Sequence, residues 1–439
     1  MNGTQTTEIG TGSRTKRIDR RMTVLASAIY LIEYLGRYDL AAAKIEMMGA
    51  FGDSAKAMLG LALTLMAISY GFGQIVMGVV GDRVPPRFVV FAGLVGAGAC
   101  NIVVGCATNA TLVCVVWFLN GVCKAMIWPS LIRQMSCDMS DKGFQTGVVG
   151  VSIASNVGIV LVYLAVVPVS ILLLSWRLAF WFAGACEVAA GVVWVLSVRT
   201  IPSVGLLKHA LRDGAHDVSE QEEKQKRQSV FPIILAAGIP LLYLVVIAHG
   251  LLRDGVTSWM PDLLKDTYQL DSIAAIMSSA ILPVFSTVCV IIAGIVYVKL
   301  KNELTASAIF WGIVVVSLGC LTFTIGRSAI LTVILLALAM SGIQGINHIL
   351  TTRVPHRFAS AGLVSTVAGL LNSATYVGAA VSGYGIAVYS EAYGWHATVV
   401  AWLIVAAVGT LTLVLCFSRW KRFISKPNDE ALNLPSSEQ

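Results

Sequence analysis

The stretch Gly78-Val-Val-Gly-Asp-Arg-Val-Pro-Pro-Arg87 is a short charged turn between two long apolar segments. Each flanking segment has about the 20 residues that a helix needs to cross the hydrocarbon core of a bilayer. Gly78 permits close packing of helices, and Asp82, Arg83 and Arg87 can form a charge latch that breaks when the protein changes conformation. The stretch therefore predicts a membrane protein with a latch in the loop after its second span.

The composition of the whole chain leads to the same class. Of its 439 residues, 56% are hydrophobic and 13% are charged. Soluble proteins carry about 25% charged residues, because polar groups must cover their surface. Residues 1–21 are polar and basic, with no apolar core or cleavage site, so we expect a solvent-facing tail rather than a signal peptide.

Twelve apolar stretches are long enough to span a bilayer, and they fall into two groups of six. We expect an all-α membrane protein with an N-terminal tail (1–21), two six-helix bundles (22–198 and 231–418), a central loop (199–230) and a C-terminal tail (419–439). The first six spans are predicted at 22–48, 57–81, 88–107, 110–134, 145–169 and 177–198. The other six are predicted at 231–261, 273–298, 305–324, 329–351, 360–388 and 396–418.

Lysine and arginine fix the expected orientation. With the N-terminus inside, the inner segments hold about 23 of the 31 basic residues and the outer loops about four. Both termini and the central loop are therefore predicted to be cytoplasmic, in the plasma membrane or, in a bacterium, the inner membrane. The net charge of +7 reflects these flanks, and we expect no nucleic-acid partner because the basic residues are scattered around the membrane ends.

Two arginines lie deep inside predicted spans, at corresponding places in the two halves: Arg37 in span one and Arg253 in span seven. A charged side chain in hydrocarbon costs at least about 2.5 kcal/mol, so it persists only where it faces protein or water. Transporters with two similar halves bind substrate near the midplane where the halves meet. We expect the arginines to converge there, because two guanidinium forks suit a phosphate or carboxylate dianion.

Local neutralisation is the alternative role for these arginines. Glu33 lies four residues before the first arginine, Asp39 lies nearby, and Asp254 adjoins the second. These carboxylates are candidates for charge balance or proton coupling. His249 and His348 could titrate near neutral pH and couple transport to protons, although a histidine in an apolar helix is more often simply hydrogen-bonded.

Polar side chains at helical spacing accompany the first arginine. Tyr30 and Tyr34 share its stripe of span one, and Tyr70 and Gln74 form a similar stripe in span two. Tyrosine hydroxyls lining a cavity would orient a substrate, whereas core tyrosines would only fill space; the spacing fits both roles. Lys124, in span four, is a further candidate cation, and pairing with an acid such as Glu187 is its alternative role.

The charged turn after span two resembles that of the major facilitator superfamily, whose fold is two six-helix bundles around a central cavity, working by alternating access. Further motifs resemble the organophosphate:phosphate antiporters, which exchange glycerol phosphate or sugar phosphates for inorganic phosphate. These are Tyr34-Leu-Gly-Arg37, Tyr70-Gly-Phe-Gly-Gln74, Trp128-Pro129 with Arg133, and Leu252-Arg-Asp-Gly-Val-Thr-Ser-Trp-Met-Pro261. The resemblance implies that Arg37 and Arg253 grip phosphate and that Tyr30, Tyr34 and Tyr70 line the cavity.

The chain also departs from that family's pattern. Glycerol-phosphate members have a lysine where Gln74 stands and a histidine where Ser155 stands, and the charged pair that some hexose-phosphate members carry in span eleven is missing. The second copy of the charged turn has decayed to Ala293-Gly-Ile-Val-Tyr-Val-Lys299. The resemblance thus implies that the two anion-binding arginines are retained and that the substrate specificity is altered. Gln74, Ser155 and Lys124 would contribute to substrate binding.

The leading hypothesis is a monomeric secondary transporter that exchanges a phosphorylated metabolite for inorganic phosphate. The first alternative is a proton-coupled carboxylate or sugar-acid transporter, in which Glu33 or Asp39 would carry the proton. The second is a membrane sensor of sugar phosphate. The sequence has no nucleotide loop, metal-ligand cluster or activated nucleophile at recognisable spacing, so we expect neither an enzyme nor a cofactor or metal.

Overall fold

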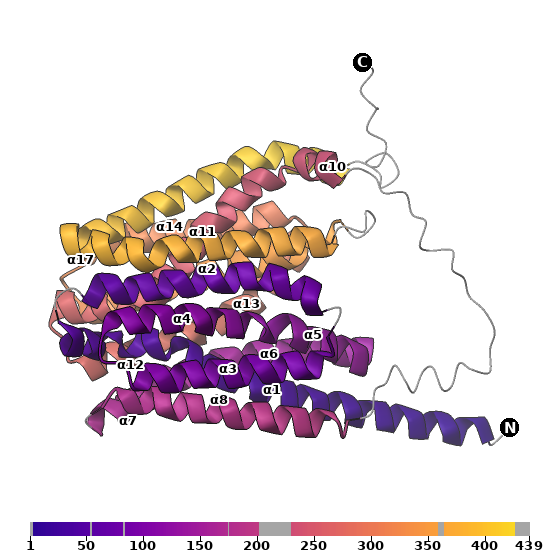
Figure 1. Ribbon diagram of the computed structural model, residues 1–439. Coiled ribbons are helices and arrows are strands. Elements are labelled where there is room, and N and C mark those ends of the chain that lie inside the picture. The colour runs from indigo at the N-terminus through magenta and orange to yellow at the C-terminus, as the bar shows by residue number, and fades with distance from the viewer. Residues whose placement is uncertain are drawn as a thin grey trace, which may run out of the picture. The chain divides into compact units, whose positions relative to one another are not determined.

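The computed structural model describes residues 3–52, 55–81, 84–173, 175–201, 230–358 and 364–425. Every regular element in these ranges is helical, as the all-α prediction requires (Figure 1). The chain divides into two compact units, Met1–Gln221 and Glu222–Gln439. Most of the predicted central loop (residues 202–229) and of the C-terminal tail (residues 426–439) lies outside the described residues.

The first unit consists of long helices joined by short turns. In Figure 1, α3 and α8 run side by side, and α1 packs on both α8 and α6. The elements are α1 (Gly3–Phe51), α2 (Ala55–Gly81), α3 (Pro86–Gly105), α4 (Ala110–Ala125), α5 (Ile127–Asp138), α6 (Asp141–Leu161), the π-helical turn η1 (Val162–Val166), α7 (Val167–Leu172) and α8 (Arg177–Val198).

The second unit is built in the same way around the pair α11 and α17, which share its most extensive contact. Its core contains the fully buried indoles of Trp259, Trp311 and Trp402. The elements are α10 (Val230–Ala236), α11 (Ile239–Tyr268), α12 (Ser272–Ser279), α13 (Ile281–Leu300), α14 (Glu303–Thr324), α15 (Ala329–Asn347), the π-helical turn η3 (His348–Arg353), α16 (Val354–His356) and α17 (Val364–Ser425).

Ten helical segments of the described chain are long and apolar enough to cross a membrane. One of them, residues 367–424, contains most of the predicted span 360–388 and all of the predicted span 396–418, and Gly394 bends it with φ 78° and ψ 174°, a conformation that favours glycine. The first predicted span lies in α1 and is not among the ten, because Glu33, Arg37 and Asp39 make it too charged. Twelve spans therefore remain a prediction.

Span seven begins later than the sequence predicted. Residues 231–261 were expected to form one helix, but α10 ends at Ala236 and α11 runs from Ile239 to Tyr268. Gly238 separates them in a left-handed conformation, with φ 76°, and Pro240 lies in the first turn of α11, where its missing amide hydrogen does no harm.

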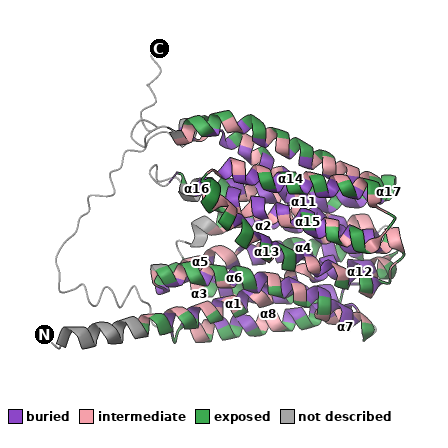
Figure 2. Cartoon of the chain, turned by 180° about the vertical axis from the view of Figure 1, so that it is seen from behind, coloured by how far each residue is buried: buried purple, intermediate pink, exposed green. Residues whose placement is uncertain are grey.

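The exposed faces of the helices are apolar, which is what a lipid environment requires. On α13, large side chains from Val284 to Val298 recur at intervals of three or four residues and are at least half exposed (Val284, Val288, Ile291, Ile295 and Val298). Figure 2 shows such exposed stripes alternating with buried ones along the helices. Contact of this surface with lipid hydrocarbon costs no free energy, whereas its contact with water would be unfavourable.

Candidate functional site

The centre of the first unit is a bent turn of α1. Gly36 has non-helical dihedral angles, φ −87° and ψ 16°, although the helix continues on both sides of it. Arg37 follows directly, and its side chain is 13% exposed. The bend thus lies next to the charged residue that the sequence placed in the first span.

Two tyrosine rings and one carboxylate surround the Arg37 guanidinium. Its Cζ atom lies 4.2 Å from the ring centroid of Tyr70 and 5.4 Å from that of Tyr34. These distances are within the range of cation–π attraction. Glu33 Oε1 lies 3.7 Å from Arg37 Nη1, which is ion-pair distance. The guanidinium is therefore held over aromatic faces with a carboxylate at one edge.

The other predicted polar residues on this side extend the aromatic stripe. Gln74 Nε2 donates a hydrogen bond to the Tyr70 hydroxyl at 2.9 Å. The Tyr30 ring is 5.0 Å from both Tyr34 and Trp128, and it is largely buried. Tyr30 therefore packs against aromatic rings, Tyr34 and Tyr70 lie next to the guanidinium, and Gln74 is bonded to Tyr70. A substrate role for these residues remains a prediction.

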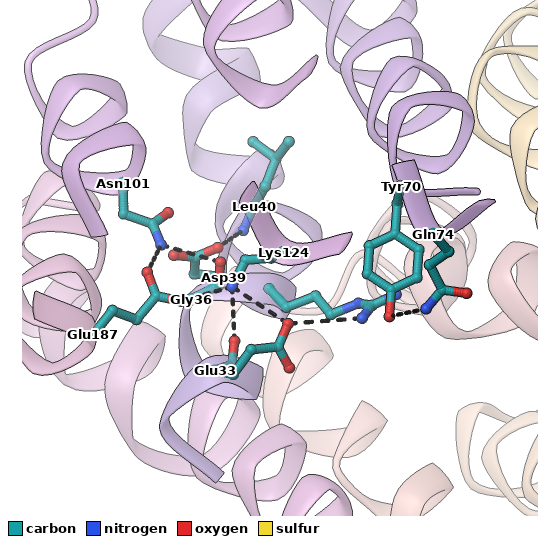
Figure 3. Close-up of polar contacts among 10 residues, drawn as sticks. Glu33, Gly36, Asp39, Leu40, Tyr70, Gln74, Asn101, Lys124 and Glu187 are labelled. Carbon is teal, nitrogen blue, oxygen red and sulfur yellow. Dashed lines mark hydrogen bonds and ion pairs between the residues drawn. The ribbon is translucent and has the colours of Figure 1, made fainter. Parts of the chain in front are cut away.

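Lys124 lies in a buried network rather than on an open surface. Its Nζ atom is 2.6 Å from Glu187 Oε1 and 3.6 Å from Glu33 Oε1, and neither Lys124 nor Glu187 has any exposed side-chain area. Figure 3 shows Lys124, Glu33 and Glu187 pointing toward one another from three helices. Pairing with Glu187, the alternative role considered for Lys124, is what the structure shows.

Two further predicted residues have partners of their own in the first unit. Asp39 is fully buried, and its Oδ1 accepts a hydrogen bond from the amide of Leu40 at 2.8 Å. The Ser155 hydroxyl donates to the carbonyl of Ser152 at 2.8 Å, within its own helix. The structure brings Asp39 close to the buried network (Figure 3).

Sequence reasoning missed Asn101 and Tyr38. Asn101 donates to Glu187 Oε2 at 2.7 Å and to the carbonyl of Gly36 at 3.1 Å. Its signal was a fully polar amide in the middle of an apolar span. The Tyr38 ring lies 5.7 Å from that of Tyr34, four residues earlier, so helical spacing could have identified it.

In the second unit, Arg253 pairs with its neighbour. Its Nη2 atom is 2.8 Å from Asp254 Oδ2, and the two side chains are 19% and 21% exposed. The ring of Tyr376, which the sequence did not single out, has its centroid 5.9 Å from the guanidinium carbon. His249 is buried one turn earlier in α11, and His348 begins the η3 turn. The convergence of Arg37 with Arg253 remains a prediction.

The predicted latch is described only in part. Asp82 and Arg83 lie outside the described residues, and Gly78 lies near the end of α2. At the start of α3, the carbonyl of Arg87 accepts a hydrogen bond from Trp194 Nε1 at 3.1 Å. The charged latch itself remains a prediction.

A polar cluster stands at the corresponding end of the second unit. Glu303, at the start of α14, is fully buried and accepts hydrogen bonds from Arg357 Nε at 2.7 Å, the Tyr297 hydroxyl at 3.0 Å and Trp420 Nε1 at 3.3 Å. Trp194 lies near the end of α8 and binds the start of α3, and Trp420 lies near the end of α17 and binds the start of α14. The two units therefore repeat this tie, although the second copy of the charged turn has decayed.

In the part of the chain that the structure describes, every regular element is helical, the exposed faces are apolar and charged side chains are buried inside helices, which together define a multi-pass membrane protein. Residues 26–383 match the Major Facilitator Superfamily, and the chain belongs to that superfamily. A crystal structure of a bacterial homologue of the human lysosomal transporter Spinster has the same fold, with a TM-score of 0.73 at 14% identity over 92% of this chain and 98% of that one.

Several relatives support the resemblance to the organophosphate:phosphate antiporters. The membrane sensor protein UhpC of Salmonella typhimurium is 25% identical over 403 residues, 88% of each chain. A probable hexose phosphate transport protein of Chlamydia muridarum is 24% identical over 411 residues, 87% of each chain. The glycerol-3-phosphate transporter of Bacillus subtilis is 27% identical over 225 residues, 48% of this chain and 50% of its own.

Proposed function

We propose that the protein is a secondary active transporter that exchanges a phosphorylated metabolite for inorganic phosphate by alternating access. The observation that carries the proposal is the setting of Arg37, a partly exposed guanidinium between the Tyr34 and Tyr70 rings with Glu33 at its edge. Relatives named as hexose phosphate and glycerol-3-phosphate transport proteins support a phosphate ester as the cargo.

In this proposal Arg37 and Arg253 bind the anion, since a guanidinium fork matches phosphate oxygens. Tyr34, Tyr70 and Gln74 orient it. Each arginine is paired with a carboxylate, Glu33 or Asp254, which balances its charge. The protein has no enzymatic activity, acts as a monomer and resides in the plasma membrane, or the inner membrane of a bacterium, with both termini in the cytoplasm.

Counterflow tests the proposal directly. The purified protein is reconstituted in liposomes loaded with inorganic phosphate, and uptake of labelled glycerol 3-phosphate and hexose 6-phosphate is measured. Uptake that requires internal phosphate supports exchange. Uptake of a carboxylate driven by a pH gradient, without any phosphate requirement, contradicts the proposal and selects the proton-coupled alternative, with Glu33 or Asp39 as the proton carrier.

A membrane sensor is the second candidate function, because a relative matching over 88% of both chains is named as one. Saturable binding of glucose 6-phosphate to the detergent-solubilised protein, together with no flux in liposomes under any gradient, would select this function. Saturable binding of glucose 6-phosphate together with its flux in liposomes would exclude the sensor function.

A further inference from the structure

Two main-chain carbonyls in the bent turn of α1 accept hydrogen bonds from side chains of other helices. Lys124 Nζ, on α4, donates to the carbonyl of Glu33 at 2.8 Å. Asn101 Nδ2, on α3, donates to the carbonyl of Gly36 at 3.1 Å. Side-chain donors of this kind are a recognised cause of sharp helix bends. The turn that presents Arg37 is therefore supported from outside α1.

Both donors are held by the same carboxylate. Glu187, on α8, uses Oε1 for Lys124 at 2.6 Å and Oε2 for Asn101 at 2.7 Å. Lys124, Asn101 and Glu187 are all essentially without solvent exposure. A buried carboxylate that is bonded through both oxygens has little freedom to move, so it fixes the two donors that bind the turn (Figure 3).

The packing at Gly36 leaves no space for a side chain. A Cβ atom added there would collide with Asn101 Nδ2 and would lie 2.6 Å from Glu187 Oε1. The main chain of α1 therefore lies directly against the Glu187 carboxylate. A change in the position of this carboxylate would be transmitted to the residue that follows Gly36, which is Arg37.

Glu187 also controls the charge around Arg37. Glu33 lies 3.6 Å from Lys124 and 3.7 Å from Arg37, so the two cations share one carboxylate. The short contact of Lys124 with Glu187 satisfies the ammonium and leaves Glu33 available to Arg37. Without the Glu187 charge, Lys124 would draw Glu33 away from the guanidinium.

We infer that Glu187 is a positioning residue for Arg37, which acts through Asn101 and Lys124 on the bent turn of α1. The inference rests on the proposed function, because it assigns Arg37 to the anion. It also gives Lys124 a structural task in place of direct contact with the substrate.

The first test measures phosphate exchange in liposomes for Glu187→Gln, Glu187→Asp and Asn101→Ala. Misplacing a binding group by about 1 Å can cost a factor of about 100, so we expect Glu187→Gln to raise the KM for the organophosphate at least tenfold. Asn101→Ala leaves no buried charge unpaired and is expected to raise KM in the same direction. Glu187→Asp, which keeps the charge, is expected to recover part of the loss. Wild-type KM in Glu187→Gln and in Asn101→Ala would overturn the inference.

Glu303→Gln is the matched control, since Glu303 is also a fully buried carboxylate bonded to a cation, in the other unit. It is expected to leave KM unchanged, whatever its effect on stability. A second control combines Glu187→Gln with Arg37→Lys. If Glu187 acts through Arg37, the combined loss is smaller than the product of the two single losses; independent factors that multiply would contradict the inference.

A readout without substrate separates this inference from the proposed function. Phenylglyoxal labels arginines, and mass spectrometry gives the rate at Arg37 relative to Arg253 in the same sample. We expect Glu187→Gln and Asn101→Ala to change this ratio several-fold. An unchanged ratio in both variants refutes positioning, whereas a changed ratio in a wild-type protein that exchanges no phosphate ester refutes only the proposed function.

Discussion

Lys124 Nζ and Glu187 Oε1 form an ion pair of 2.6 Å in which neither side chain has exposed area. Removing two charges from water costs several kcal/mol for each ion, and the cost is recovered only where the geometry and the remaining hydrogen bonds are good. Here Asn101 and the carbonyl of Glu33 supply those further bonds. The pair is therefore a fixed part of the first unit and cannot leave its partners at low cost to meet a substrate.

Lys124→Met should destabilise the protein by about 3–5 kcal/mol, because it leaves the buried Glu187 carboxylate without its cation. Thermal unfolding in detergent should show a large decrease in Tm. Lys124→Met combined with Glu187→Met should recover much of that stability but not the affinity for phosphate ester. A stable single variant that loses only binding would instead indicate direct contact between Lys124 and substrate.

Arg37→Lys and Arg253→Lys should each reduce exchange at least tenfold while the protein still inserts, since lysine keeps the charge but lacks the guanidinium fork. The measurement is flux per inserted molecule. Arg199→Lys, an exposed residue at the end of α8, is the control and should transport normally. Normal exchange by either test variant would rule out a bidentate grip at that position.

Gly36→Ala should impair both stability and exchange. The added methyl would lie 2.6 Å from Glu187 Oε1, and overpacking of this kind costs about 1–3 kcal/mol. Gly49→Ala is a matched control in the same helix, because nothing lies within 4 Å of its added Cβ. Equal behaviour of the two variants in Tm and in KM would show that the bend tolerates a side chain.

Tyr70→Phe and Tyr70→Leu separate the ring from the hydroxyl. Phenylalanine keeps an aromatic face 4.2 Å from the Arg37 guanidinium carbon and loses the hydroxyl, which accepts a hydrogen bond from Gln74. Leucine also loses the cation–π attraction, which is worth about 0.5–2 kcal/mol. The KM should therefore rise more for leucine than for phenylalanine. The reverse order would mean that the hydroxyl, and not the ring, serves the site.

Local sequence patterns predicted the parts of the site that lie on one helix. Tyr34 and Glu33 precede Arg37 by three and four residues, so helical spacing alone brings them together. Tyr70 comes from another helix; its spacing with Gln74 singled it out, and the family resemblance implied that it lines the cavity with Arg37. The class of fold followed from twelve apolar stretches and their basic flanks, before any contact was known.

The buried support of the site could not be read in this way. Asn101 and Glu187 are single polar residues in apolar spans, which marks them as unusual. The bond of Asn101 to the Gly36 carbonyl of α1, and its bond to Glu187, depend on the packing of α1, α3 and α8. Gly238 and Pro240, by contrast, did carry a local signal: glycine ends a helix and proline begins one. Because this signal was not used, the predicted start of span seven was too early.

The repeated tryptophan tie has a consequence for how the two units can change. Trp194 binds a main-chain carbonyl, which every residue type at position 87 would supply, whereas Trp420 binds the side chain of Glu303. Replacement of Arg87 would keep its tie, and replacement of Glu303 would break the tie and leave Arg357 without its carboxylate. The tryptophan hydrogen bond thus leaves position 87 free to vary in the first unit. In the second unit, the same kind of bond requires Glu at position 303.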